Sequence, residues 1–185
     1  MIFSIGELID VLIMTVGVGY IFMDALSSEP QLELMVGFDW ARLRLACLIT
    51  APAVILHELG HKFAALAFGL IATFHAAYTW LLLGIALKLL NFGFIFFVPG
   101  YVEIQGIQTP LQSALSAFAG PAVNLILWIG ARTAMRLIPH MKLKTFRILA
   151  MTRQINGFLF IFNMLPIYFF DGFKVFSGLI AWIWP

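Results

Sequence analysis

Long stretches of this sequence are apolar with only two or three charged residues each, and this feature limits its possible folds more than any other. The longest apolar runs cover about residues 3–23, 43–69 and 111–137, and about 20 apolar residues are enough to cross a bilayer. Hydrophobic residues make up 62% of the 185 positions and charged residues only 11%, whereas soluble domains carry about 25% charged residues. This excludes an ordinary soluble domain and a disordered chain, and it predicts a polytopic membrane protein.

The expected fold is all-α, with about five to six transmembrane helices at roughly 20 residues each plus short loops. The first span, about residues 3–23, lacks the basic segment and cleavage site of a secretory signal, so we expect it to be retained. A single membrane-embedded domain is expected over residues 1–185, with its core at about 42–175 and its last full span at about 148–165. The expected location is the cell membrane, as an integral multi-pass protein.

The segment between residues 70 and 110 has too little continuous apolar length for another ordinary span. Trp80–Leu90 is helical in character, but about 11 residues rise only about 16 Å, or half a bilayer. Phe94–Val98 and Tyr101–Ile104 have an extended pattern on either side of a Pro-Gly pair. We therefore expect a re-entrant half-helix followed by a short membrane-embedded β segment, whose backbone must be hydrogen-bonded by protein or water.

Charge and cysteine content narrow the partners further. The net charge is +2, which is too weak to indicate a nucleic acid partner. The apolar runs make the lipid bilayer the expected surroundings. The single cysteine, Cys47, excludes an internal disulfide and a thiol-only metal site, and we interpret it as a lipid-facing or core-packing residue. The sequence does not indicate an oligomeric state.

A metal-binding pattern lies inside the second apolar run, where His57-Glu58-Leu59-Gly60-His61 matches H-E-x-x-H. On a helix, His57 and His61 are about 40° apart on one face, so their imidazoles can bind one Zn²⁺ together. Glu58 lies next to that face and can reach a bound water without being a ligand. A charged side chain at this depth costs at least about 2.5 kcal/mol, and packing alone does not account for that cost. Gly60 would let a neighbouring element approach the helix closely.

Catalytic zinc sites usually have three protein ligands, and the residues leave three candidates for the third. Asp171 follows an apolar span, lies in a proline-broken segment and precedes a glycine. His75 and Glu103 are the alternatives, although an interfacial histidine and a solvated acid at a strand end are their simpler interpretations.

Three motifs, in this order, resemble the signatures of the site-2 protease family of intramembrane zinc metalloproteases. They are His57-Glu58-Leu59-Gly60-His61-Lys62, Gly120-Pro121-Ala122-Val123-Asn124 and Asn163-x-x-Pro166-x-x-x-x-Asp171-Gly172. The resemblance covers about residues 42–175. The family often has prolines between the positions of Pro166 and Asp171, where this chain has Ile167–Phe170. The backbone path and the substrate-facing surface can therefore differ from the family's at this segment.

The resemblance implies a zinc metalloendopeptidase that hydrolyses peptide bonds of membrane-spanning proteins in regulated intramembrane proteolysis. It implies that His57, His61 and Asp171 hold one Zn²⁺ per chain. It also implies that Glu58 is the general base that activates the attacking water. The implied partner is a transmembrane protein substrate.

Four further residues have roles that the resemblance implies. Asn124 would face the active site and donate to the oxyanion of the tetrahedral intermediate; its other interpretation is a hydrogen bond between helices. Asn163 and Pro166 would unwind the end of their helix so that Asp171 can turn toward the metal, and these two residues and Gly172 would bind substrate or support the structure of the site.

A shared metal also constrains the topology. His57 and His61 lie toward the C-terminal end of their span, and Asp171 lies just past the end of its own. The two spans must then be parallel, with one crossing between them at residues 111–137, so residues 78–98 should not cross fully. Basic residues gather on the opposite side, which the positive-inside rule makes cytoplasmic, whereas the family's site usually opens toward the cytoplasm, so the two indications of orientation conflict.

Two other functions use the same residues. A non-catalytic protein that binds or transports metal would not need Glu58, and a catalytically inactive protein that holds membrane helices would not need intact motifs. For the protease, an extended edge near residues 94–104 is expected to hold an unwound substrate by strand addition.

Overall fold

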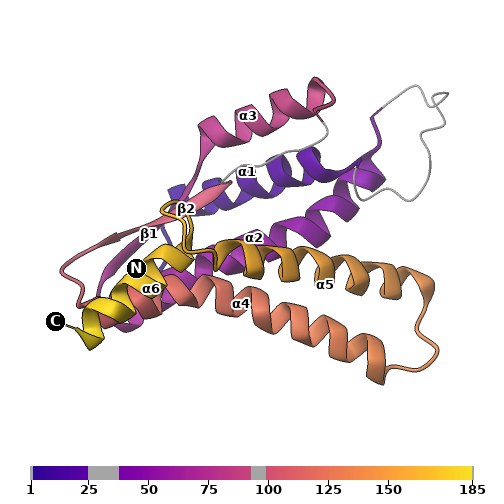
Figure 1. The fold of residues 1–185 in the computed structure, drawn as a ribbon. Helices are drawn as coiled ribbons and strands as arrows, with labels where there is room; N and C mark the ends of the chain where they lie inside the picture. The colour runs from indigo at the N-terminus through magenta and orange to yellow at the C-terminus, as the bar shows by residue number, and fades with distance from the viewer. Residues whose placement is uncertain (1, 25–37, 93–98, 185) are drawn as a thin grey trace. The chain divides into compact units, whose positions relative to one another are not determined.

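The computed structural model describes residues 2–24, 38–92 and 99–184 of the chain (Figure 1). Along these ranges it contains α1 (Ile5–Phe22), α2 (Trp40–Ala67), β1 (Ile71–Ala76), α3 (Tyr78–Leu89), β2 (Gly100–Gln105), α4 (Pro110–Leu137), α5 (Leu143–Asn163) and α6 (Asp171–Ile183). The prediction of a mostly helical protein is therefore confirmed.

Three of these helices, α1, α2 and α4, are long and apolar enough to cross a membrane, as a membrane protein requires. The 21-residue α5 carries Lys144, Arg147 and Arg153, so its apolar part is shorter. The 12 residues of α3 agree with the expected short helix, since such a helix is only about 18 Å long. A total of five to six crossings and a re-entrant path for α3 stay predictions.

Local sequence rules account for where two of the spans begin. At the start of α1, the Ser4 hydroxyl accepts a hydrogen bond from the Glu7 amide, and the Glu7 carboxylate accepts one from the Ser4 amide. Thr109 and Gln112 form the same reciprocal pair before α4, with Pro110 in the first turn. Each pair satisfies backbone donors that a helix start otherwise leaves without partners.

The chain divides into two compact units. The first contains the residues up to Pro52 and His75–Tyr101, and so holds α1, the start of α2, and α3. Within it, a Cβ added at Gly19 would lie 2.3 Å from the Cys47 sulfur, so α1 and α2 are closely packed there. Of the two interpretations of Cys47, these contacts favour packing, and its thiol donates to the Thr15 carbonyl at 3.5 Å.

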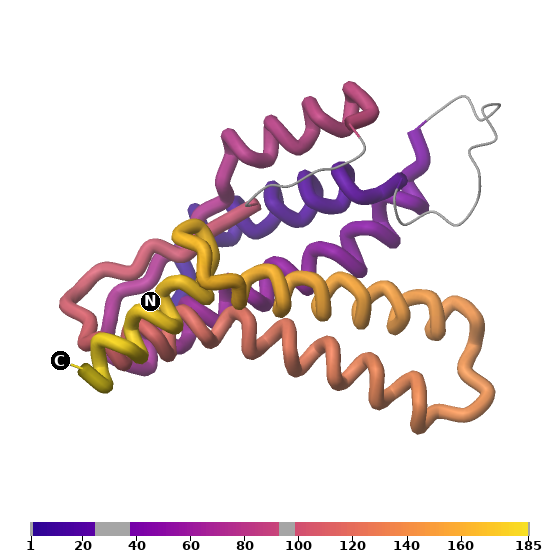
Figure 2. Tube along the Cα trace, in the orientation of Figure 1, coloured from indigo at the N-terminus to yellow at the C-terminus, as the bar shows by residue number. Residues whose placement is uncertain are grey.

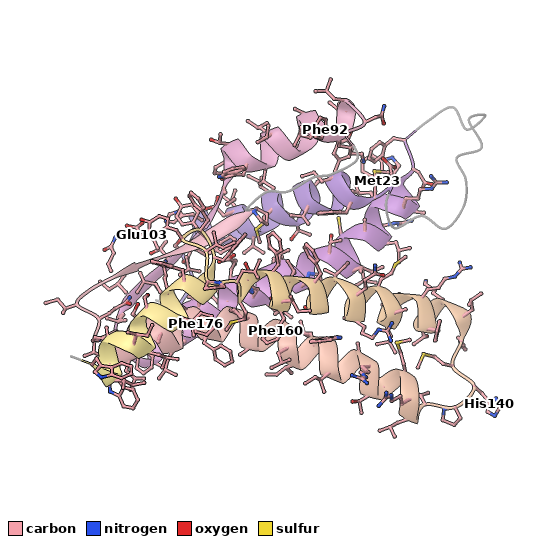
Figure 3. All side chains as sticks on the ribbon, in the orientation of Figure 1. Met23, Phe92, Glu103, His140, Phe160 and Phe176 are labelled. Atoms are coloured by element: carbon pink, nitrogen blue, oxygen red, sulfur yellow. The ribbon has the colours of Figure 1, made fainter. Side chains whose placement is uncertain are left out.

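The second unit contains Ala53–Phe74 and Val102–Pro185. Its helices α4 and α5 form a hairpin, shown in orange in Figures 1 and 2, and α6 also packs on α4. His140 lies at the turn of this hairpin and Phe160 lies on α5 (Figure 3). The rings of Phe160 and Trp128 are 6.1 Å apart, so aromatic packing joins the two helices.

A two-stranded sheet pairs β1 with β2. Along β1 the buried residues alternate, with Ala72, Phe74 and Ala76 on the buried face, as the period of a strand requires. The ammonium group of Lys62, a fully buried residue of α2, donates to the Ala72 carbonyl at 2.8 Å and so fixes the start of β1 to that helix.

The predicted extended segment Tyr101–Ile104 lies within β2, and this part of the β prediction is confirmed. The other expected segment, Phe94–Val98, lies outside the described residues. Strand β1 was not predicted from the sequence, because its short alternating pattern follows directly on the end of an apolar helix.

Candidate metal centre

Three potential ligands converge at the end of α2 and the start of α6. The His57 and His61 Nε2 atoms are 3.1 Å apart, and Asp171 Oδ2 lies 3.1 Å from the first and 3.3 Å from the second. Ligand atoms of a tetrahedral zinc ion are about 3.3 Å apart, because the bonds are about 2.0–2.1 Å long. The three side chains therefore already have the separations that one zinc ion requires.

The orientation of the His61 ring is set by a backbone carbonyl. Its Nδ1 atom lies 2.8 Å from the Ser116 oxygen on α4. A carbonyl oxygen only accepts hydrogen bonds, so Nδ1 carries the ring proton. The Nε2 lone pair of His61 consequently points toward the other two ligands.

His57 is oriented by the Asn124 side chain, which is fully buried on α4. Asn124 Nδ2 donates to the Ala53 carbonyl at 2.9 Å, and this contact determines which end of the amide is nitrogen. Asn124 Oδ1 then faces His57 Nδ1 at 2.6 Å and must accept its proton. The His57 Nε2 lone pair is thereby also directed at the cluster.

The donor set fits zinc. Two imidazole nitrogens and a carboxylate oxygen with converging lone pairs repel one another unless protons or a cation lie between them. Two histidines and one carboxylate are also a common ligand set for zinc. Among the described residues, His57, His61 and Asp171 form a group of three whose ligand atoms all lie within 4.8 Å of one another.

Two glycines make this arrangement possible. A Cβ at Gly120 would lie 2.3 Å from His61 Nε2 and 2.9 Å from His57 Cε1, so only glycine leaves room for the two rings. A Cβ at Gly60 would lie 2.7 Å from the Ala119 carbonyl, which agrees with the close approach expected at Gly60. Helices α2 and α4 are in near-backbone contact beside the ligands.

Glu58 is buried next to this cluster, with 8% of its surface exposed. Its carboxylate lies within electrostatic reach of His57, His61 and Asp171, and no described residue hydrogen-bonds to it. Its oxygens are therefore available to a water molecule at the cluster.

Of the three candidates for a third ligand, Asp171 is the one that lies at the histidines. His75 is on β1, where its Nδ1 lies 3.8 Å from Asp10 Oδ2 and its ring lies 5.4 Å from that of Tyr101. Glu103 is exposed on β2 and accepts a hydrogen bond from the Gln105 side chain.

The segment between α5 and α6 places Asp171 next to the two histidines. Helix α5 ends at Asn163, Pro166 lies in the exposed turn that follows, and Asp171 begins α6. A Cβ at Gly172 would lie 2.4 Å from the Met164 carbonyl, so the segment folds back tightly against α6. This path agrees with the expected unwinding of the helix end.

The contacts of Asn124 favour the second of its two interpretations. Its amide donates to the Ala53 carbonyl and, at 2.9 Å, to Asn156 Oδ1, so neither amide proton is free for an oxyanion. The hydrogen bonds join α4 to α2 and α5 instead. Sequence reasoning missed Asn156 and the Ser116 carbonyl; a buried amide in an apolar helix is a signal for the first, whereas a backbone carbonyl has no sequence signal.

Comparison with known proteins gives two relatives. A protein of Methanocaldococcus jannaschii is 35% identical over 175 residues, which cover 94% of this chain and 84% of the relative. A protein of Synechocystis is 29% identical over 156 residues, which cover 84% of this chain and 36% of the relative. Both bear the name "putative zinc metalloprotease". No family model and no solved structure matches the chain.

Proposed function

Because this chain belongs to the zinc metalloprotease family of its Methanocaldococcus relative, we propose that it is a site-2-type intramembrane zinc metalloendopeptidase. The observation that carries the proposal is the convergence of His57, His61 and Asp171 beside the buried Glu58, with α2 apolar and long enough to cross a membrane. We further propose a single multi-pass domain in the cell membrane that cleaves transmembrane protein substrates.

The chemistry divides between the metal and the chain. His57, His61 and Asp171 would hold one zinc ion, which supplies a Lewis acid that polarises the scissile carbonyl and lowers the pKa of water to about 7. Glu58 accepts the proton of the attacking water and delivers it to the leaving amine, as the glutamate of an H-E-x-x-H motif does. Asn124 keeps His57 in the tautomer that presents Nε2.

A substrate helix must unwind before it can react, because its carbonyls are hydrogen-bonded within the helix. In the described part of the chain, β1 and β2 pair only with each other, and each strand therefore has a second edge. We propose that one of these edges binds the unwound substrate by strand addition. Such binding would hold the scissile bond extended.

A Glu58→Gln variant tests the proposed reaction. Cleavage of single-span test substrates in proteoliposomes should fall at least about 100-fold, since general acid–base catalysis contributes about that much or more. Zinc content should stay at the parental value of about one per chain, because Glu58 is not a ligand. Cleavage at the parental rate by the variant would contradict the proposed base.

The same pair of proteins separates the protease from a metal carrier. A carrier would bind and move zinc equally well with glutamate or glutamine at position 58, and the parent would not cleave any test substrate. A parent that takes up no zinc, even after its addition, would contradict the metal proposal itself.

A further inference from the structure

Asn156 is a fully buried amide on α5, with 1% of its surface exposed. Its side chain makes two hydrogen bonds: Oδ1 accepts from Asn124 Nδ2 at 2.9 Å, and Nδ2 donates to the Thr152 carbonyl at 2.8 Å. Burying an amide costs free energy unless its hydrogen bonds are made. Here they are made, and one of them leads to a residue that contacts a candidate metal ligand.

The three hydrogen bonds are all donated in the same direction, from His57 through Asn124 and Asn156 to the backbone of α5. The Thr152 carbonyl can only accept, so the nitrogen of Asn156 must face it and its oxygen must face Asn124. Asn124 consequently directs its nitrogen at Asn156 and its oxygen at His57 Nδ1. The backbone of α5 thus acts through two side chains on the tautomer of His57.

We propose that Asn156 is a positioning residue of the metal centre, which holds Asn124 so that His57 presents an unprotonated Nε2 to the metal. The inference rests on the proposed zinc-binding function of His57. Without the Asn156 oxygen, a buried donor of Asn124 loses its acceptor, and only the Ala53 carbonyl still holds the amide with its oxygen toward His57, so this orientation is less strongly fixed. The imidazole can then place its proton on Nε2, where it blocks metal binding.

Asn156 also links the two parts of the ligand set. Helix α5 ends at Asn163 and leads to Asp171, whereas His57 belongs to α2. The contacts through Asn124 therefore connect the helix before one ligand with the helix that carries another. A partner that hydrogen-bonds a ligand directly, as Asn124 does, usually affects metal affinity by about 10–100-fold, and Asn156 acts through that partner.

Three variants of the full chain in detergent test this role through zinc affinity, measured by competition with a chelator. Asn156→Leu keeps the size but removes the acceptor, and should bind zinc about 10-fold more weakly, the lower end of the range for a direct partner. Asn156→Asp in its protonated form can still accept from Asn124 and donate to the Thr152 carbonyl, so it should restore the affinity. Thr152→Val, the matched control, keeps its carbonyl and should match the parent.

The His57 ring supplies a second measurement, by ¹⁵N NMR of the metal-free protein. The parent and Asn156→Asp should show the proton on Nδ1, and Asn156→Leu should show a loss of that tautomer. Parental affinity in Asn156→Leu, or weak binding in both variants with the tautomer unchanged, would overturn the inference. If the parent binds no zinc, the proposed function fails, but the tautomer populations still decide the role of Asn156.

Discussion

Histidine and aspartate meet in both compact units, with different results. In the second unit, Asp171 Oδ2 lies 3.1–3.3 Å from the Nε2 atoms of His57 and His61. In the first unit, Asp10 Oδ2 lies 3.8 Å from His75 Nδ1, and the Tyr78 hydroxyl donates to the same carboxylate. Of these two groups, the one around Asp171 brings three ligand atoms to one point.

Burial does not account for this difference. The Asp10 side chain is 13% exposed and that of Asp171 is 21% exposed. What distinguishes the second unit is that each histidine has its Nδ1 occupied by an oxygen, from Ser116 or Asn124, so both Nε2 atoms turn inward. A metal site therefore depends on the hydrogen-bond partners that orient its ligands as much as on the ligands themselves.

The largest effect is expected from removing the carboxylate. Asp171→Ala should lower zinc affinity by more than about 100-fold, because loss of a ligand exceeds the 10–100-fold effect of an outer contact. Asp10→Ala, the matched change in the first unit, should leave about one zinc per chain. Zinc content of the purified proteins gives the answer, and equal losses in both variants would remove the distinction between the two groups.

A smaller but still large effect is expected from filling the space beside the rings. Gly120→Ala places a methyl group 2.3 Å from His61 Nε2, so it should displace the ring and weaken zinc binding by at least about 10-fold. Gly130→Ala, on the same helix, meets nothing within 4 Å and should be neutral or stabilise the helix by up to about 1 kcal/mol. Isothermal titration with zinc and thermal melts distinguish the two variants. Equal zinc binding by both would contradict the close contact between Gly120 and the histidine rings.

The smallest effect is expected in the first unit. Tyr78→Phe removes the hydroxyl that donates to Asp10 but keeps the ring of a side chain that is about half exposed and far in sequence from the candidate ligands. Zinc affinity should be unchanged, and the melting temperature should hardly fall. A clear loss of zinc in this variant would show that the metal site depends on Asp10 and its neighbours.

The candidate ligands were accessible from the sequence because their chemistry is unusual for their surroundings. Packing in an apolar run rarely requires two histidines at helical spacing. Asp171 was a candidate because it is one of few acids that lie next to an apolar span. Asn163 and Pro166 also indicated correctly that the helix ends before Asp171. The histidine pair required only local spacing and the cost of polar groups in a bilayer, whereas the choice of Asp171 over His75 and Glu103 and the role of Asn163 came from the family resemblance.

Other features depend on contacts between distant segments, which local patterns do not contain. The role of Gly120 becomes visible only when His61 lies against it, and that of Asn156 only when Asn124 points at it. The strand β1 follows a helix of 28 residues without a polar break, so its alternating pattern is hidden in apolar sequence. Local spacing and the family resemblance therefore predicted the ligands better than the residues that support them.

The long separation of the ligands along the chain has a consequence for the unfolded state. His61 and Asp171 are about 110 residues apart, and a cross-link that closes a loop of this length removes conformational entropy worth up to about 4.7 kcal/mol at 25 °C. An ion held by both side chains would act as such a cross-link, and one that a chelator can remove. Part of the resistance of this chain to denaturation would then be set by the metal content of the solution.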